Sequence, residues 1–243
     1  MTRVVLLAAV VGGVVGCESS AAAVPCLDVP ACPDVATITA FTVLTSGTPG
    51  SGPAPGTADH RTTVSVCHLG HSALRLRWAL HGAAVPAAFR TNLSRCHADV
   101  WEADAAEFYL APLGPAAPFT PVNYTEIDVG PAAGAMWLGH IQNPSGFAPD
   151  NASYADLPEC NRSGVTASVT HSDTGWTADV EVPLRFVAAA ADLPTSRWRA
   201  NLYRWSGHPR VLTAWSPTSC TAAGNHSCNL PHVPRDFGVW EFV

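Results

Sequence analysis

The chain has 243 residues, of which 13% carry a charge, and its formal net charge is −6. A mildly acidic chain with so few charges is poorly suited to bind phosphate backbones or anionic lipid surfaces, which argues against nucleic acid and membranes as partners. All thirteen basic residues are Arg. Because Ala, Gly and Pro are also abundant, this bias indicates a GC-rich genome and not a function.

Residues 1–23 have the features of a secretory signal peptide. Arg3 precedes the apolar run Val4 to Val15, and Ala21 to Ala23 offers small residues for cleavage. The run is too short to span a bilayer. We therefore expect a secreted or extracellular protein. The alternative is a lipid anchor on Cys17, because the preceding Val-Val-Gly also fits a lipoprotein box.

Sequons and cysteines support export. A eukaryotic glycoprotein is favoured because the chain carries five N-glycosylation sequons, at Asn92, Asn123, Asn151, Asn161 and Asn225. Eight cysteines favour an oxidising compartment. Without Cys17 an odd number remains as disulfide candidates, namely Cys26, Cys32, Cys67, Cys96, Cys160, Cys220 and Cys228. We predict short local bridges between Cys26 and Cys32 and between Cys220 and Cys228, and the remaining connectivity is open.

The segment 24–60 differs in character from the rest. It holds one predicted strand, Ala36 to Leu44, followed by the Pro-, Gly- and Ser-rich stretch Thr45 to Asp59, which is typical of a linker. This segment is either a small appendage or an outlying first strand. A single domain is predicted over 61–243.

Short alternating strands dominate that domain. Apolar and basic residues alternate strictly from Leu74 to Leu80, and Thr125 to Val129 alternates in the same way. A hairpin is predicted over 165–182, and two further strands over 198–205 and 237–243. Helical periodicity is nearly absent. The fold class expected is all-β, an antiparallel β-sandwich of the jelly-roll type with little helix.

Catalytic constellations are weak. There is no G-x-S-x-G elbow, and no His has a recognisable partnership with a Ser or Cys. The carboxylates at Glu102, Asp104 and Glu107 are close in sequence, but nothing forces a pair to face across a substrate. Glu126 and Asp128 are explained by alternation on a solvated strand face. We therefore expect no enzyme, although an accessory module associated with glycoside hydrolysis is compatible with the sequence.

Metal binding has some support. Cys67, His68 and His71 could bind zinc, as could Cys96 with His97, but in an exported chain these thiols are expected in disulfides. A calcium site is left open, because hard oxygen ligands gather at Asp99, Glu102 and Asp104. A solvated acidic loop is the preferred interpretation of that group.

Aromatic residues point to sugar binding. Sugars stack on aromatic rings while amide, carboxylate and Arg groups bind their hydroxyls, and this chain has eight Trp. Core positions are predicted for Trp78, Trp176 and Trp198, which lie on apolar strand faces. Trp101 differs, because its neighbours are polar. A mixed polar and aromatic strand face is predicted for Arg199, Asn201, Tyr203 and Trp205.

Five segments in order resemble the carbohydrate-binding module family nine and, more distantly, DOMON domains. They are Trp101 to Leu110 (WEADAAEFYL), Tyr124 to Pro131 (YTEIDVGP), Gly175 to Leu184 (GWTADVEVPL), Trp198 to Arg204 (WRANLYR) and Pro234 to Gly238 (PRDFG). The resemblance implies a β-sandwich that binds glucan, xylan or cello-oligosaccharide ends between two aromatic rings.

The same resemblance implies specific ligand-binding residues. Trp101 matches one clamp ring, and Glu107 matches a carboxylate that binds hydroxyls. The second ring is expected at Pro231, where this chain has no aromatic side chain. Either Tyr203 or Trp205 replaces that ring, or the sugar site is lost.

The predicted function is a secreted, non-catalytic carbohydrate-binding module that recognises a plant- or cell-wall-type polysaccharide or its ends. Two alternatives remain. The first is a structural or adhesion sandwich with an extracellular protein as its partner. The second, implied by DOMON domains, is haem binding, with Met136 and a His as axial ligands, although a Met on a strand is more often core filler.

Overall fold

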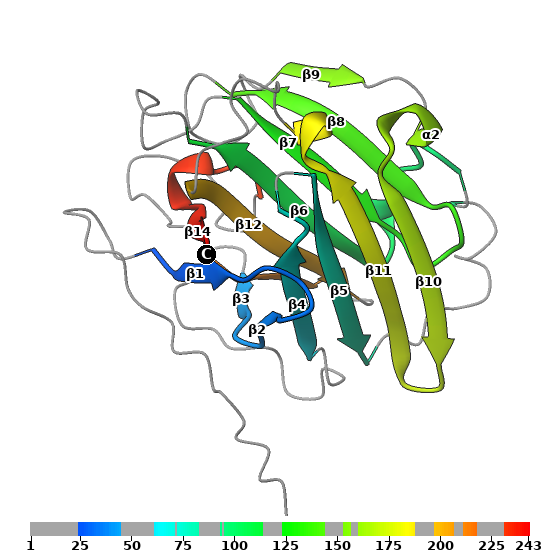
Figure 1. Cartoon of the computed structure of the whole chain (residues 1–243). Coiled ribbons are helices and arrows are strands. Elements are labelled where there is room, and N and C mark those ends of the chain that lie inside the picture. The colour runs from blue at the N-terminus through cyan, green and yellow to red at the C-terminus, as the bar shows by residue number, and fades with distance from the viewer. Residues whose placement is uncertain are drawn as a thin grey trace, which may run out of the picture.

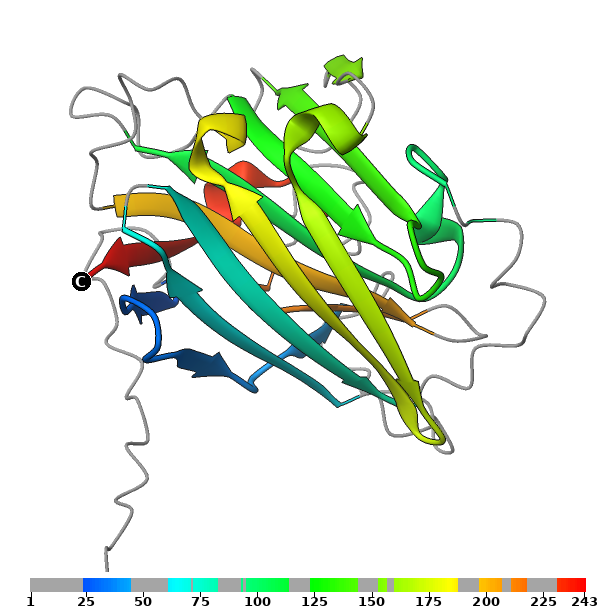
Figure 2. The same cartoon turned by 45° about the vertical axis from the view of Figure 1, so that its right-hand side comes forward.

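The computed structural model describes residues 24–44, 61–70, 72–82, 93, 95–113, 123–143, 153–156, 160–187, 197–206, 211–217 and 231–243. Over these residues the chain forms two β-sheets packed face to face, with short helical turns at their ends (Figures 1 and 2). The predicted all-β sandwich is confirmed.

Several predictions fall on residues outside the described ranges. These are the signal peptide 1–23 with Cys17, the stretch Thr45 to Asp59, His71, the sequons at Asn92, Asn151 and Asn225, and the cysteines Cys220 and Cys228. The other two sequon residues, Asn123 and Asn161, have exposed side chains. Both are therefore accessible for glycan attachment.

The smaller sheet is antiparallel throughout its described strands. Its order is β10 (Thr166–Ser172), β11 (Gly175–Pro183), β5 (Ala73–His81), β4 (Thr62–His68) and β2 (Ala36–Ile38). β10 and β11 form the hairpin that the sequence predicts, since Thr166 pairs with Glu181 and Ser172 with Gly175.

The larger sheet has the described strand order β1 (Cys26–Val29), β14 (Gly238–Phe242), β12 (Arg197–Ser206), β6 (Ala105–Pro112), β7 (Asn123–Val129), β8 (Met136–Gln142) and β9 (Ser153–Asp156). β13 (Val211–Ala214) pairs with β12 and with β3 (Thr42–Leu44). β1 runs parallel to β14, so the two ends of the described chain lie side by side (Figure 1).

The strand expected from Ala36 to Leu44 is two strands in different sheets. β2 pairs with β4 in the smaller sheet, whereas β3 pairs with β13 in the larger one. The chain crosses between the sheets at Thr39–Phe41, where the Phe41 ring lies 6.3 Å from that of Trp78. The described part of the N-terminal segment is thus built into both layers of the sandwich.

The main core lies between the sheets. Along β5, Leu74, Leu76, Trp78 and Leu80 are buried while Arg75 and Arg77 are exposed, as the alternation predicts. The larger sheet contributes side chains such as Phe108, Ile127 and Leu202. The predicted core positions of Trp78, Trp176 and Trp198 are confirmed, since each is at most 1% exposed.

The outer face of the larger sheet is buried as well, which the sequence did not predict. A second apolar cluster covers it, to which the loop before β6 contributes Val100 and the C-terminal segment contributes Phe237. The prediction that Glu126 and Asp128 lie on a solvated face is therefore wrong: they are 5% and 0% exposed. Strand alternation distinguishes two faces but does not reveal what covers them.

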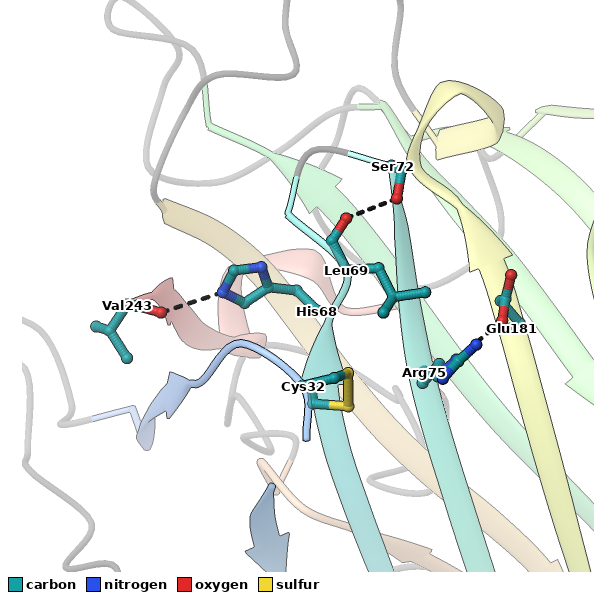
Figure 3. The surroundings of a disulfide bond; sticks show 8 residues. Cys32, His68, Leu69, Ser72, Arg75, Glu181 and Val243 are labelled. Atoms are coloured by element: carbon teal, nitrogen blue, oxygen red, sulfur yellow. Dashed lines mark hydrogen bonds and ion pairs between the residues drawn. A yellow bond between two sulfur atoms is a disulfide. The ribbon is translucent and has the colours of Figure 1, made fainter. Parts of the chain in front are cut away.

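Two disulfides join distant parts of the described chain, Cys32 to Cys67 and Cys96 to Cys160. The predicted Cys26–Cys32 bridge is wrong, because the isolated bridge between Ala31 and His68 brings Cys32 beside the end of β4. Cys26 is also disulfide-bonded. Near the first bridge, His68 Nε2 lies 3.1 Å from the backbone oxygen of Val243 (Figure 3).

The helical elements of the described chain are single turns. They are η1 (Val100–Glu102), α2 (Cys160–Ser163), α3 (Leu184–Val187) and η3 (Pro234–Asp236). Within the described ranges, no helix has the length and hydrophobicity needed to cross a bilayer.

Candidate functional site

A cavity of about 460 Å³ opens on the outer face of the larger sheet. Its lining combines aromatic rings with carboxyl groups, and consists of Trp101, Glu107, Tyr109, Glu126, Trp137, Trp205, Pro231 and His232. These residues come from η1, from β6, β7, β8 and β12, and from the segment that leads to η3. The volume is within the range of pockets that bind small molecules.

Strand register gathers the carboxyl groups. Glu107 of β6 pairs with Asp128 of β7, and the next pair on the same face is Tyr109 with Glu126. The three carboxyl groups have oxygens within 4.8 Å of one another. The Tyr109 hydroxyl donates to Glu126 Oε1 at 2.9 Å and lies 3.4 Å from Glu107 Oε2. Two adjacent cross-strand pairs thus place three acids and one phenol together.

Burial makes two of these acids, Glu126 and Asp128, hard to ionise. Desolvation raises the pKa of Glu126 to about 8, although hydrogen bonds from Tyr109 and with Asp128 oppose the rise. The pKa of Asp128 is also raised well above its ordinary value, first by desolvation and then by the charges of Glu126 and Glu107. Glu126 and Asp128 are therefore held toward their protonated forms at neutral pH.

His232 does not neutralise the cluster. Its Nε2 lies 3.8 Å from Glu126 Oε2, and its Nδ1 is hydrogen-bonded to the Tyr124 hydroxyl at 3.0 Å. Burial lowers the pKa of His232 to about 4, so the imidazole is neutral at pH 7. The contact with Glu126 is consequently one between a neutral ring and a carboxyl group, and not a charged pair.

Three indoles form the aromatic walls. Trp101 and Trp205 are partly exposed, and the ring of Trp137 meets that of Trp101 edge to face at 5.7 Å. Trp137 lies flat along β8 over Gly139, where a Cβ would come within 2.1 Å of the indole. A glycine at this position is what allows the ring to occupy the edge of the cavity.

The structure divides the sequence-predicted ligand residues into two groups. Trp101, Glu107 and Trp205 line the cavity, together with Pro231 at the position expected for the second clamp ring. Trp137 also lines the cavity, so that Trp137 and Trp205 add aromatic surface to that of Trp101.

Arg199, Asn201 and Tyr203 are fully buried and do not line the cavity. Asn201 donates to the carbonyl oxygen of Ser216, Tyr203 donates to that of Pro231, and Arg199 donates to that of Arg235. These polar side chains thus fix the position of the backbone at Ser216, Pro231 and Arg235. Tyr203 therefore does not replace the missing clamp ring in this cavity.

Sequence reasoning missed four lining residues: Tyr109, Glu126, Trp137 and His232. Tyr109 could have been found, because it follows Glu107 by two positions on a strand and so shares its face. Glu126 would have required the register between β6 and β7, in which it pairs with Tyr109, and Trp137 that between β7 and β8, in which it pairs with Asp128. His232 comes from a distant segment, and no local pattern indicates it.

The metal ligands considered from the sequence have other roles. Asp104 is buried against Arg204, with Oδ1 and Nε 3.4 Å apart, while Asp99 and Glu102 are exposed. Cys67 and Cys96 are in disulfides, which removes the thiolates that zinc requires. Met136, proposed as a haem ligand, packs in the core between the sheets at 7% exposure.

We expect the free energy of unfolding to fall between about pH 6.5 and 8. The unfolded chain loses the Glu126 proton near its ordinary value of 4.5, whereas the folded chain keeps it to about 8, so rising pH favours unfolding. His232, with an ordinary pKa of 6.5 and a folded pKa of about 4, opposes this trend, but only below about 6.5. Above that, stability should decline by up to about 2 kcal/mol.

Urea unfolding at about pH 6.5 and at about pH 8 measures this decline in the free energy of unfolding. Glu126→Gln cannot ionise and should reduce the slope, leaving the part due to Asp128. A wild-type stability that stays level or rises over this interval would contradict the assignment of buried, protonated acids.

The chain was compared with known proteins, and the similarity found is one of fold. No family model and no curated protein matches the chain. Among solved structures, it is similar to a carbohydrate-binding module of family 9 from Caldicellulosiruptor kristjanssonii, the family that the sequence motifs resemble. The complex with cellotriose aligns over 89% of this chain and 93% of that chain, with 10% identity and a TM-score of 0.46. The complex with glucose covers 90% and 95%, with 10% identity and a TM-score of 0.47.

Proposed function

We propose that this chain is a non-catalytic carbohydrate-binding module whose ligand is a sugar unit, or the end, of a cell-wall-type polysaccharide. The observation that carries the proposal is the cavity in which Trp101, Trp137 and Trp205 stand around Glu107 and Glu126. A pyranose ring presents C–H groups that stack on indole and hydroxyls that bind carboxyl oxygens. Both kinds of surface meet in this cavity.

The arrangement of the acids favours binding over hydrolysis. Glycosidases place two carboxyl groups on opposite sides of the scissile bond, about 5 to 9 Å apart. Here Glu107 and Glu126 lie on neighbouring strands of one sheet, with oxygens within 4.8 Å, and contact the same Tyr109 hydroxyl. Among the described residues of the lining, no acid stands across the cavity from Glu107 and Glu126.

An extracellular location fits the same function. Polysaccharides of cell walls lie outside the cell, where the Cys32–Cys67 and Cys96–Cys160 disulfides are stable. The exposed sequon residues Asn123 and Asn161 would carry glycans away from the cavity lining.

Replacing Trp101 by Ala should weaken binding to the glycan by about 30-fold or more, the effect of removing an aromatic hot spot. A glycan array on protein expressed in eukaryotic cells identifies the ligand, and isothermal titration calorimetry measures its affinity. Trp101→Phe keeps a stacking surface and should lose much less. Arg77→Ala, on the exposed face of β5, is the matched control and should bind as the wild type does.

Unchanged affinity of Trp101→Ala, with a normal circular dichroism spectrum, would remove the stacking role. A blank array combined with recovery of a specific extracellular protein would favour the adhesion function instead. A Soret band on the purified protein would favour haem.

A further inference from the structure

The outermost strand of the smaller sheet, β10, pairs on one side only within the described chain (Figure 1). Its seven residues span about 23 Å, whereas the terminal strands β1, β2, β3 and β9 have three or four residues each. Five of the seven residues are exposed, so solvent reaches this edge. Among the described strands, β10 is therefore the longest open edge of the sandwich.

The turn between β10 and β11 determines which backbone groups point to this edge. Ser172 pairs with Gly175 across a two-residue turn, so these two residues exchange both backbone hydrogen bonds, and every second pair along the hairpin does the same. The residues in between, Ala167, Val169 and His171, direct their N–H and C=O groups away from β11. No backbone hydrogen bond within the described chain uses these groups. Each residue thus offers one donor and one acceptor to an added strand.

β10 lacks the features by which proteins usually keep an open edge unpaired. Such edges commonly carry Lys, inward-pointing charges, Pro or a bulge. The sequence of β10 is Thr-Ala-Ser-Val-Thr-His-Ser, with no acidic residue, Lys, Arg or Pro, and its register with β11 is continuous. Thr and Val favour strand pairing. The edge is therefore suited to accept another strand.

The order of residues in β10 suits a second copy of the same strand. An antiparallel pair centred on Val169 places Ala167 opposite His171, and Ser168 opposite Thr170, of the second copy. Ala167 and Val169, which pack against the core, then continue the core face of the joined sheet, whereas hydroxyl side chains meet on its outer face. No like charges face each other in this pair.

The nearest carboxylates also permit this pairing. Asp179 and Glu181 of β11 lie one strand away from the edge, so at least about 14 Å separates them from their equivalents in the second copy. Each lies beside a basic side chain, since Glu181 Oε2 is 2.9 Å from Arg75 Nε and Asp179 Oδ1 is 3.7 Å from Arg77 Nε. Repulsion between the carboxylates of the two copies is therefore small.

We propose that β10 pairs with β10 of a second copy of this chain, antiparallel about a two-fold axis at Val169, so that two five-stranded sheets join into one. A two-fold contact of this kind uses the same surface on both copies. No described residue of the smaller sheet lines the cavity. The inference therefore goes beyond the proposed function, and dimerisation can be tested separately from sugar binding.

Sedimentation equilibrium of the purified chain from about 1 to 300 µM tests the inference. The mass of the wild type should rise from that of one chain to that of two. Ser168→Lys with Thr170→Lys places Lys opposite Lys in the proposed pair and should weaken association at least about 30-fold. Thr63→Lys with Thr177→Lys adds the same charge to the same face of the sheet, away from the edge. This matched control should associate as the wild type does.

Charge reversal tests the register of the pair. Ser168→Glu with Thr170→Glu should also be monomeric alone, but an equimolar mixture with the Lys variant should form a mixed dimer, because Lys then faces Glu. Val169→Pro removes an outward N–H without breaking a hydrogen bond to β11. It should therefore abolish association while the circular dichroism spectrum stays that of a folded protein.

The outcomes distinguish this inference from the proposed function. A wild type that stays monomeric over the whole concentration range would overturn the inference and leave sugar binding untouched. Association that survives in the Lys variant or in Val169→Pro would mean that another surface is used, which overturns it as well. So would a mass that grows beyond two chains, or a mixture of the Lys and Glu variants that stays monomeric. A dimer that binds no glycan would contradict only the proposed function.

Discussion

Replacing Arg204 by Leu should destabilise the protein by about 3 to 5 kcal/mol, the cost of leaving a buried charge without its partner. The Arg204 side chain is 0% exposed, and its Nε lies 3.4 Å from Asp104 Oδ1. Its Nη1 donates to the carbonyl oxygen of Arg61 at 3.1 Å and lies 3.4 Å from Thr62 Oγ1. Loss of this side chain would remove the charged partner that lies beside the buried Asp104 carboxyl group. Urea unfolding monitored by Trp fluorescence measures the change.

The ion pair also bears on the cavity, because of where Asp104 lies. Asp104 is three residues after Trp101 and three before Glu107, so Arg204 anchors the turn between one indole wall and one acid. We therefore expect Arg204→Leu to weaken ligand binding as well as stability.

A surface pair provides the control for Arg204. Arg75 Nε lies 2.9 Å from Glu181 Oε2, but these side chains are 56% and 42% exposed. Arg75→Leu should change stability by only about 0.5 kcal/mol, since solvent screens such a pair. In the double variant Asp104→Leu with Arg204→Leu, much of the stability should return, because neither member of this ion pair is left behind without the other. Equal costs for Arg204→Leu and Arg75→Leu would contradict the importance of burial.

The strands of the smaller sheet were predictable because one of their faces is wet. Arg75 and Arg77 alternate with Leu74, Leu76 and Trp78, and the structure places the basic side chains in solvent and the others in the core. Successive side chains of a strand point to opposite faces, so a strand with one face in water and one in the core alternates between polar and apolar residues. The same reasoning located the β10–β11 hairpin.

The larger sheet was harder to predict because both of its faces are buried. In β7, Glu126 and Asp128 alternate with Ile127 and Val129, which is the pattern of a half-exposed strand. The loop with Val100 and the segment with Phe237 cover that second face. These segments are distant in sequence, so the pattern within β7 cannot report them.

Trp101 and Glu107 were predicted as ligand residues because they match a family motif. The structure brings both to the cavity. Glu126 was dismissed as a solvated residue, although the register of Tyr109 with Glu126 makes it a neighbour of Glu107. The alternation within β6 or β7 alone does not give their register, because the apolar pattern specifies register only where one face is buried and the other is not.

Removing the Cys96–Cys160 disulfide should lower stability by about 4 kcal/mol and weaken ligand binding at the same time. The bridge spans 64 residues of sequence, and closing a loop of that size restricts the unfolded chain strongly. It ties the segment leading to Trp101 to α2, beside the hydrogen bond from His97 N to the carbonyl oxygen of Met136. The double variant Cys96→Ser with Cys160→Ser releases this segment from α2. The position of the Trp101 side chain in the cavity should then be less well fixed. Denaturant unfolding and titration calorimetry measure the two effects.

Removal of the Cys32–Cys67 disulfide is the control that distinguishes a loss of stability from a loss of ligand binding. Cys32 and Cys67 are 35 residues apart, so their replacement by Ser should also cost about 4 kcal/mol. Cys67 lies on β4 of the smaller sheet, and neither cysteine lines the cavity. Affinity should therefore fall in the first double variant and stay unchanged in the second, when both are measured below their unfolding transitions. If both lose affinity equally, the effect is one of global stability, and the Cys96–Cys160 bridge does not position the Trp101 wall.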